Sequence, residues 1–357
     1  MIDLRSDTAT MPTQPMREAI ANAEVGDEQI REDPTVNELE RRAAEILGHE
    51  DSVFVPTATM ANEIALRVLG EPGDELIAEE LSHILIAELG GPAVHAGLMT
   101  RPLPSVAGRF TTDQVRAAAR RGDLGHVPTT RIVAIENTHN AAGGRVWPVP
   151  EVEAMAETCR ELDLSLHLDG ARLFNAAVAS GVEPSAIAGH ADTVTICFSK
   201  GLGCPLGAIV AGSAERMVRA RRFKHQFGGA MRQAGIVAAA CVYALDHNVD
   251  RLAEDHARAR RLAEALHQAG VAVDLERVET NFVQLDVGSM GITPGDATER
   301  LLAEGVRVSG TLHPGVLRAV THLGIGDEDI DHAIEAIPRA LGAQRLPAMK
   351  NAAATTT

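Results

Sequence analysis

Residues 193–212 read TVTICFSKGLGCPLGAIVAG. The apolar run at 193–198 predicts a buried strand, and the run at 208–211 predicts a second one. The segment between them is rich in glycine and carries Lys200 directly after the first run. Because glycine permits tight turns, this segment can fold closely around a bound molecule. The stretch therefore predicts a sheet with a lysine at the end of a core strand.

Lys200 is the leading candidate for chemistry that needs a primary amine. Lysine and arginine total 33, yet the only lysines are Lys200, Lys224 and Lys350. Burial at a strand end would favour the free amine, which is the form that makes a Schiff base. A surface lysine in a glycine-rich turn is the plain alternative. A dinucleotide-binding loop at 201–207 is a weaker one, because that motif belongs after the first strand of its unit.

Apolar runs alternate with helical stretches through residues 1–245, which we expect to form a large cofactor-binding domain. Further strands are expected at 53–55, 75–78, 131–135 and 165–168, with helices at 60–69 and 152–162. This alternation predicts an α/β fold with a mainly parallel, seven-stranded-type sheet and helices on both faces.

A smaller C-terminal α+β domain is expected at residues 246–345, followed by a disordered tail at 346–357. Its predicted elements come in the following order: a helix at 257–269, strands at 272–275 and 282–286, a helix at 294–304, strands at 307–309 and 316–321, and a helix at 328–340.

Polar clusters follow three of the predicted strands, at 136–140, 169–172 and 199–201. Ligands of parallel sheets bind at the carboxyl ends of the strands, so these clusters are expected to meet. A carboxylate such as Asp169 can pair with a protonated pyridine nitrogen and keep the ring of such a cofactor electron-withdrawing. The alternatives are a helix N-cap for Asp169 and a structural ion pair for Arg172.

Further polar groups could serve an anionic cofactor. Thr57, Ala58 and Thr59 open the predicted helix, and free N–H groups at a helix start can bind phosphate. Arg232 ends a basic run that could equally be a solvated helix face.

Two histidines are candidates for stacking on the cofactor or for base chemistry. His83 follows the strand at 75–78, and His126 precedes the strand at 131–135. Each histidine alone would more often be structural. His167 and Asp169 lack a third ligand, so no metal site is expected.

The net charge of −16 and the isoelectric point near 5.3 disfavour nucleic acid and anionic membranes as partners. The four cysteines form no CxxC pair, and the amino-terminal residues have no signal-peptide pattern. These features indicate a cytoplasmic protein with reduced thiols.

The chain resembles the low-specificity L-threonine aldolases, pyridoxal-phosphate enzymes of the aspartate-aminotransferase-like fold type I. The resemblance covers nearly the whole chain and rests on motifs at 4–8, 33–40, 56–62, 136–140, 167–172, 199–203, 231–235 and 320–323. It implies cleavage of L-threonine, L-allo-threonine and related β-hydroxy-α-amino acids to glycine and an aldehyde such as acetaldehyde. It also implies a homotetramer, a dimer of dimers with sites at subunit interfaces.

The resemblance assigns roles to individual residues. Lys200 corresponds to the Schiff-base lysine, Asp169 to the pyridinium partner, and His83 and His126 to histidines near the ring and the substrate hydroxyl. The remaining roles are cofactor contacts from Thr57, Ala58, Thr59, Arg172 and Ser199, a phosphate contact from Arg232 of a neighbouring subunit, and substrate-carboxylate contacts from Ser6, Arg172 and Arg318.

The sequence departs from the family pattern at Ala58, at Ile30-Arg31 and at His225. The first and third concern the phosphate, and the second concerns the rim of the site. A pyridoxal-phosphate β-eliminating lyase on the same fold and a non-catalytic pyridoxal-phosphate-binding protein are the alternative functions.

Overall fold

The central sheet of the computed structural model has seven strands, and the structure describes residues 1–122 and 125–343. In spatial order the strands are β2 (Asp51–Val55), β8 (Ala208–Gly212), β7 (Thr193–Cys197), β6 (Ser165–Gly170), β5 (Thr130–Glu136), β3 (Glu75–Glu79) and β4 (Met99–Leu103).

Only β8 runs against the other six strands. The short glycine-rich connection from β7 to β8 allows an antiparallel pairing and no crossover. The prediction of a mainly parallel sheet is confirmed, and β4 is a strand that the sequence analysis did not predict.

Both faces of this sheet are buried, and successive residues of a strand serve different cores. Phe54, Ile77 and Val133 belong to the largest hydrophobic cluster. Their neighbours Val53, Leu76 and Ile132 belong to clusters on the other face. A strand buried on both sides needs apolar residues at consecutive positions, which explains the continuous apolar runs in the sequence.

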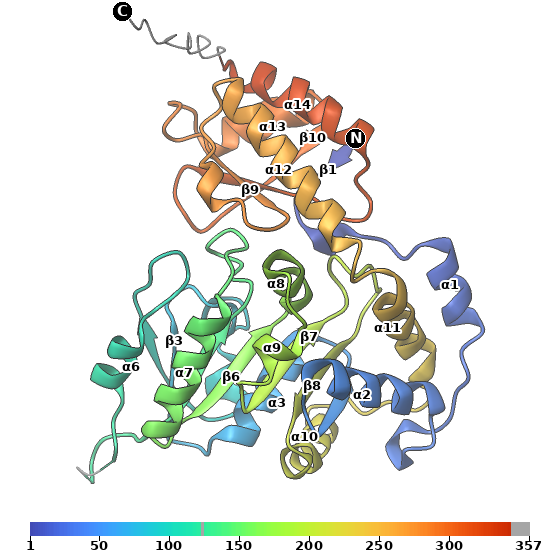
Figure 1. The fold of residues 1–357 in the computed structure, drawn as a ribbon, viewed down its shortest axis with the longest axis vertical. Helices are drawn as coiled ribbons and strands as arrows, with labels where there is room; N and C mark the ends of the chain where they lie inside the picture. Colours follow the sequence, from blue (N-terminus) through green and yellow to red (C-terminus); the bar gives the residue numbers. More distant parts are fainter. Residues whose placement is uncertain (123–124, 344–357) are drawn as a thin grey trace, which may run out of the picture.

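Helices cover the two faces and the edges of the sheet (Figure 1). The helices of this part of the chain are α1 (Gln14–Ala21), α2 (Pro34–Leu47), α3 (Ala58–Leu69), α4 (His83–Ile86), α5 (Gly91–His95), α6 (Thr112–Ala118), α7 (Val149–Glu161), α8 (Leu173–Ser180), α9 (Ser185–Ala188), α10 (Ala214–Gln226) and α11 (Gly235–His247). Short 3₁₀ turns occur at η1 (Asp7–Ala9) and η2 (Glu28–Ile30).

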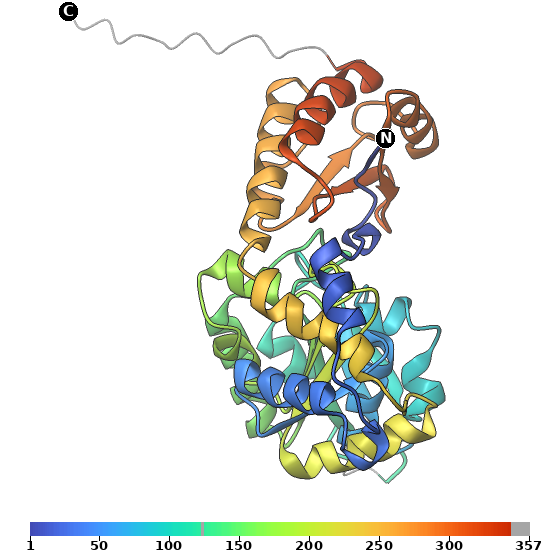
Figure 2. The ribbon, with the colours of Figure 1, turned by 90° about the vertical axis from the view of Figure 1, so that its right-hand side faces the viewer.

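A smaller unit with its own hydrophobic core follows. Its helices are α12 (Leu252–Gln268), α13 (Pro294–Ala303) and α14 (Asp327–Leu341), with the 3₁₀ turn η3 (Leu275–Arg277). Its antiparallel sheet has the order β11 (Ser309–Gly310), β12 (Val316–Val320) and β9 (Phe282–Asp286). Figure 2 shows α12 and α14 side by side along this sheet.

The amino terminus belongs to this smaller unit. β1 (Ile2–Asp3) pairs in parallel with β10 (Val306–Arg307), and Ile2 and Leu4 are buried in the unit's core. Figure 1 places the N-terminus there, above the large sheet. The chain therefore crosses between the two units twice, and the domain boundary near residue 245 stays a prediction.

One predicted strand of the smaller unit is wrong. Residues 272–275 form no strand, because Asp274 accepts a hydrogen bond from the amide of Glu276 and opens η3. The predicted tail at 346–357 lies outside the described residues. No helix in the described part of the chain is long and apolar enough to cross a membrane.

Candidate active site

The carboxyl ends of β2, β3, β5, β6 and β7 lie at the same edge of the central sheet. β2 reaches this edge because it is antiparallel to β8, which is itself antiparallel to β7. Glu136 at the end of β5 pairs in register with Asp169 at the end of β6. The edge therefore gathers Thr57, His83, Glu136, Asp169 and Lys200 from separate strand ends.

Asp169 is a buried carboxylate in a fixed orientation, with only 2% of its surface exposed. Its Oδ2 accepts a hydrogen bond of 3.0 Å from the Asn62 side chain, and its Oδ1 accepts one of 3.1 Å from the Ala171 amide. Asn62 comes from α3, whose packing against β6 and β7 brings it here. Asn62 lies in a motif of the resemblance, but no signal in the sequence assigned it this contact.

His167 explains how Asn62 is held. Its Nε2 lies 3.2 Å from Asn62 Oδ1, and its Nδ1 lies 2.9 Å from the hydroxyl of Thr193. Burial lowers the pKa of His167 to about 4, against a smaller opposing effect of the Asp169 charge. His167 is therefore a neutral structural residue inside the sheet, on the same strand as Asp169 and two positions before it.

His83 lies beside Asp169 and is anchored at two points. Its Nδ1 lies 2.9 Å from Glu88 Oε1, and its backbone amide donates a 2.7 Å hydrogen bond to Glu136 Oε2. The hydrogen bond with Glu88 raises the pKa of His83 above 6.5; burial opposes the rise, and the charges of Asp169, Glu88 and Glu136 add to it. No hydrogen bond to His83 Nε2 occurs within residues 1–122 and 125–343.

His83, Glu88 and Asp169 place one polar atom each within 4.8 Å of one another. The Asn62 side-chain amide donates to both carboxylates, so hydrogen bonds account for their approach. The expectation of no metal site stays a prediction.

Two guanidinium groups, of Arg172 and Arg318, form a second part of the site, which we call the arginine end. Arg172 binds both oxygens of Asp7 at 2.7 and 2.8 Å. Arg318 donates to Asn140 Oδ1 at 2.9 Å, and Arg172 approaches the same oxygen at 3.4 Å. Both guanidinium groups also lie over the Phe282 ring, at 5.0 and 5.5 Å from its centroid.

The charges at this end do not cancel. Burial opposes ionisation of Asp7, but the charge and hydrogen bonds of Arg172, with the charge of Lys200, lower its pKa to about 2. Burial and the charge of Arg172 lower the pKa of Arg318. Two guanidinium groups near one carboxylate leave excess positive charge, which suits a second carboxylate. Asp7 is a site residue that the sequence analysis named only within a motif.

Ser6 stands at the start of η1 next to this cluster. Its hydroxyl accepts hydrogen bonds from the amide and the hydroxyl of Thr8, at 3.2 and 2.9 Å. It also donates to Asp7 Oδ1 at 3.4 Å. Ser6 therefore orders the turn that presents Asp7 to Arg172.

The start of α3 lies at the same edge as Lys200. Thr57 caps this helix by accepting a hydrogen bond from the Met60 amide, and Thr57 and Thr59 are exposed. Ala58 is the first residue of the helix. Ser199 is near the thiol of Cys197, at 3.3 Å between Oγ and Sγ. Exposed hydroxyls and helix N–H groups suit an anionic group, and Ala58 can supply its backbone N–H as glycine would.

Two candidate residues do not join the others within one chain. His126 is exposed in the loop ahead of β5, and the amino end of that strand lies at the opposite edge of the sheet. Arg232 is exposed and paired with Asp27 at 2.7 Å. His225 is also exposed, whereas Lys224 is buried and paired with Glu28. The sequence places His126 before a strand, but it cannot show which copy of the chain it would serve.

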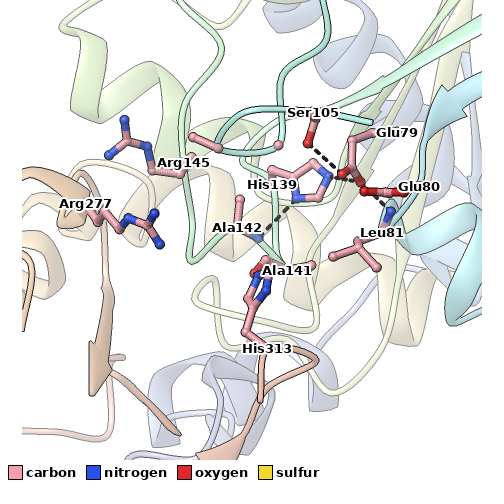
Figure 3. Close-up of a pocket in the computed structure, with 12 residues that line it drawn as sticks. Glu79, Glu80, Leu81, Ser105, His139, Ala141, Ala142, Arg145, Arg277 and His313 are labelled. Atoms are coloured by element: carbon pink, nitrogen blue, oxygen red, sulfur yellow. Dashed lines mark hydrogen bonds and ion pairs between the residues drawn. The ribbon is translucent and has the colours of Figure 1, made fainter. Parts of the chain in front are cut away.

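A cavity of about 150 Å³ lies at the end of β3, which β5 separates from the strand of Asp169, β6 (Figure 3). Inside it His139 Nε2 lies 3.0 Å from Glu79 Oε2, and Ser105 donates to Glu79 Oε1 at 2.7 Å. Burial opposes ionisation of Glu79, but the hydrogen bonds of His139 and Ser105 lower its pKa. Glu79, His139 and Ser105 are therefore paired with one another in the wall of this cavity.

Comparisons with known proteins identify a family and several relatives. A family model described as beta-eliminating lyase matches residues 3–289. The low-specificity L-threonine aldolase of Escherichia coli K12 is 41% identical, over 92% of this chain and 96% of the relative. A probable low-specificity L-threonine aldolase of Arabidopsis thaliana is 40% identical, over 93% and 95%.

Solved structures share the fold. The threonine aldolase of Leishmania major matches with a TM-score of 0.83 at 20% identity, over 96% of this chain and 100% of that one. A double mutant of Thermus thermophilus aspartate aminotransferase matches with a TM-score of 0.71 at 17% identity, over 95% and 91%. At these identities the likeness concerns the fold alone.

Proposed function

The chain belongs to the beta-eliminating lyase family and, within it, to the low-specificity L-threonine aldolases, and on this premise we propose a reaction and roles for its residues. The reaction is carbon–carbon cleavage of L-threonine, L-allo-threonine and related β-hydroxy-α-amino acids to glycine and an aldehyde. One observation carries the proposal: Lys200, the buried Asp169, His83 and a pair of arginines lie together at one edge of the sheet.

The cofactor that suits these residues is pyridoxal 5′-phosphate. Lys200 would hold it covalently, and the start of α3 from Thr57 to Thr59 would hold its phosphate, with Ser199 beside it. Asp169 would pair with the pyridinium nitrogen, because Asn62 and the Ala171 amide already fix the carboxylate. When bound, this group accepts the electrons that leave the broken bond.

The arginine end would bind the substrate carboxylate. Arg318 and Arg172 offer the excess positive charge, while Asp7 keeps Arg172 in place and Ser6 orders the adjoining turn. A carboxylate held at two guanidinium groups fixes the rotation of the amino acid about its Cα. This fixation can set the Cα–Cβ bond in the orientation in which it breaks most easily.

His83 would accept the proton of the β-hydroxyl group. Glu88 is an acceptor for Nδ1–H, which leaves Nε2 as the basic nitrogen of the ring. Loss of the hydroxyl proton lets the C–O bond become a carbonyl while the Cα–Cβ bond breaks. A proton then returns to Cα, and glycine and the aldehyde leave.

The proposed assembly is a cytoplasmic homotetramer with sites at subunit interfaces. His126 lies at the wrong edge to serve the site of its own chain, so it would act in the site of a neighbouring copy. The exposed Arg232 would likewise reach the phosphate of a neighbour. No nucleic acid or membrane is expected as a partner.

A product assay tests the proposed reaction directly. Purified protein with pyridoxal phosphate and L-threonine should release equal amounts of acetaldehyde and glycine. Ammonia with a keto acid would identify a β-eliminating lyase instead, the activity that the family description names. No product from any β-hydroxy amino acid would favour a non-catalytic cofactor-binding protein.

A further inference from the structure

Two carboxyl groups, of Glu63 and Glu88, are buried behind His83. Glu63 lies on α3 and Glu88 follows α4, and their residues are 2% and 6% exposed. Within the residues that the structure describes, neither forms an ion pair with an arginine or a lysine. His83 can balance at most one negative charge, so two buried carboxylates beside it would be very unfavourable unless they share a proton.

The contacts indicate which carboxyl group carries that proton. Glu88 Oε1 accepts a hydrogen bond from Asn62 Nδ2 at 3.0 Å and contacts His83 Nδ1 at 2.9 Å. Among the residues that the structure describes, both oxygens of Glu63 and Oε2 of Glu88 are buried without a hydrogen-bond partner. Because a carboxylate can only accept, a proton on Glu63 supplies the donor that Glu88 Oε2 lacks.

The packing leaves room for the Glu63 carboxyl group beside this neighbour. A Cβ atom added to Gly91, at the start of α5, would lie 1.9 Å from Glu63 Oε1. Only glycine therefore leaves room for the Glu63 carboxyl group at this point. Burial, then the charge of Glu88 and then a hydrogen bond with Glu88 raise the pKa of Glu63 to about 9.

We propose that Glu63 and Glu88 are positioning residues for His83: an acid–carboxylate pair that shares one proton and holds His83 with hydrogen on Nδ1 and a free Nε2. The inference rests on the proposed function, in which Nε2 accepts the proton of the substrate hydroxyl. The pair directs a negative charge at the far side of the ring, which makes Nε2 a stronger base.

The same pair is linked to Asp169. The Asn62 side-chain amide donates to Glu88 and to Asp169 at 3.0 Å each, so one residue sets the spacing of the two carboxylates. The charged groups that face His83 are Glu88, Asp169 from β6 and Glu136 from β5. In the described part of the chain, Glu88 is the one ionisable group whose charge acts on Glu63.

Three substitutions test the roles of Glu63 and Glu88 separately. Glu63→Gln keeps a neutral hydrogen-bond donor, Glu63→Met has similar size without one, and Glu88→Gln removes the charge. The exposed surface substitution Glu71→Gln, beyond the end of α3, is the control. For each variant we would measure single-turnover cleavage of L-threonine across pH, cofactor content and thermal stability.

Glu88→Gln should move the acid limb of the pH–rate profile to lower pH, because His83 loses the partner that raises its pKa. It should also slow cleavage at the plateau of the profile by roughly 10²-fold, because an amide can fix the wrong tautomer of His83. In a serine protease the wrong tautomer of the catalytic histidine costs up to about 10⁴-fold. Glu63→Gln should stay within about 2-fold of wild type, given the retained donor. Glu63→Met should shift the acid limb to higher pH, because the unshared charge of Glu88 then acts on His83.

A second measurement does not depend on activity. The carbonyl stretch of a buried, protonated carboxylic acid should be visible in the infrared spectrum of the protein and absent in Glu63→Gln. The band should remain in Glu71→Gln, whose carboxylate is exposed and ionised.

The outcomes decide the inference. Equal pH profiles for Glu63→Gln and Glu63→Met, or an infrared spectrum unchanged by Glu63→Gln, would overturn it. So would a Glu88→Gln variant with the wild-type profile. If the variants change only thermal stability, the pair is structural and the inference is wrong. If wild-type protein does not cleave threonine, the proposed function fails, whereas the infrared result still tests the shared proton.

Discussion

The two ends of the site handle buried charge in opposite ways. At the arginine end, Asp7 is paired with Arg172 through two short hydrogen bonds, and a second guanidinium group, of Arg318, adds positive charge. At the histidine end, Glu63, Glu88 and Asp169 lie together with no arginine or lysine bonded to them in the described residues. One end is stabilised by pairing ions, and the other by hydrogen bonds and a retained proton.

This difference separates binding from proton transfer. Excess positive charge attracts a carboxylate and is insensitive to pH, because arginine stays protonated. Excess negative charge around a histidine makes that ring basic and sensitive to pH. The predictions below test the two sides of this contrast, Lys200 and the proposed assembly.

The largest effect is expected for Lys200→Ala. Lys200 is close enough to the arginine end for its charge to act on Asp7, and it follows β7 beside Asp169 on β6. The variant should show no turnover above background and no absorbance band of a covalently held cofactor. If borohydride still fixes pyridoxal phosphate to the variant protein, Lys200 is not the attachment point.

His83→Ala should bind cofactor but cleave threonine more slowly. Loss of a general base typically costs about 10²–10⁴-fold in rate. Single-turnover rates at saturating threonine measure this step. The acid limb assigned to His83 should disappear in the variant, and an unchanged limb would mean that another group titrates there.

Asp7→Asn should destabilise the protein with little change in His83 chemistry. Leaving Arg172 buried without its partner typically costs about 3–5 kcal/mol. In wild type the low pKa of Asp7 adds stability above pH 3.8, which is lost as pH falls toward 2. Denaturant unfolding at several pH values should show this loss in wild type and not in Asp7→Asn.

Arg318→Leu should weaken substrate binding more than it weakens stability. A hydrogen bond to a charged group contributes about 1.5–3 kcal/mol, so kcat/KM should fall roughly 10- to 150-fold. Arg318 pairs with no carboxylate in the described residues, so unfolding should change little. A fall in kcat at constant KM would contradict a role in binding the substrate carboxylate.

His126→Ala should give the smallest effect in rate and the clearest sign of assembly. The variant should cleave threonine more slowly than wild type but faster than His83→Ala. Mixing it with Lys200→Ala under conditions that exchange subunits should raise activity above the sum of the two. Exchange would be verified with labelled subunits. If activity does not rise on mixing, His126 does not act in the site of a neighbouring subunit.

Much of the fold could be predicted because its signals are local. The run at 193–198 and the loop at 199–207 predicted a strand end with a lysine, and β7 and the loop follow that pattern. β4 was missed because its residues are mostly exposed and include Pro102, so no apolar run marks it. The strand predicted at 272–275 is wrong because the local turn of Asp274 overrides its apolar neighbours.

The sequence by itself determined which strand ends carry polar groups, since parallel strands deliver their carboxyl ends to one edge. It therefore identified Asp169, Lys200 and His83 as candidates. Tertiary structure alone decided their partners. Asp7 and Arg172 are 165 positions apart, and Asn62 and Asp169 are 107 apart. Such contacts depend on how helices and the small unit pack on the sheet, which local patterns do not encode. The same packing placed Glu63 against Glu88.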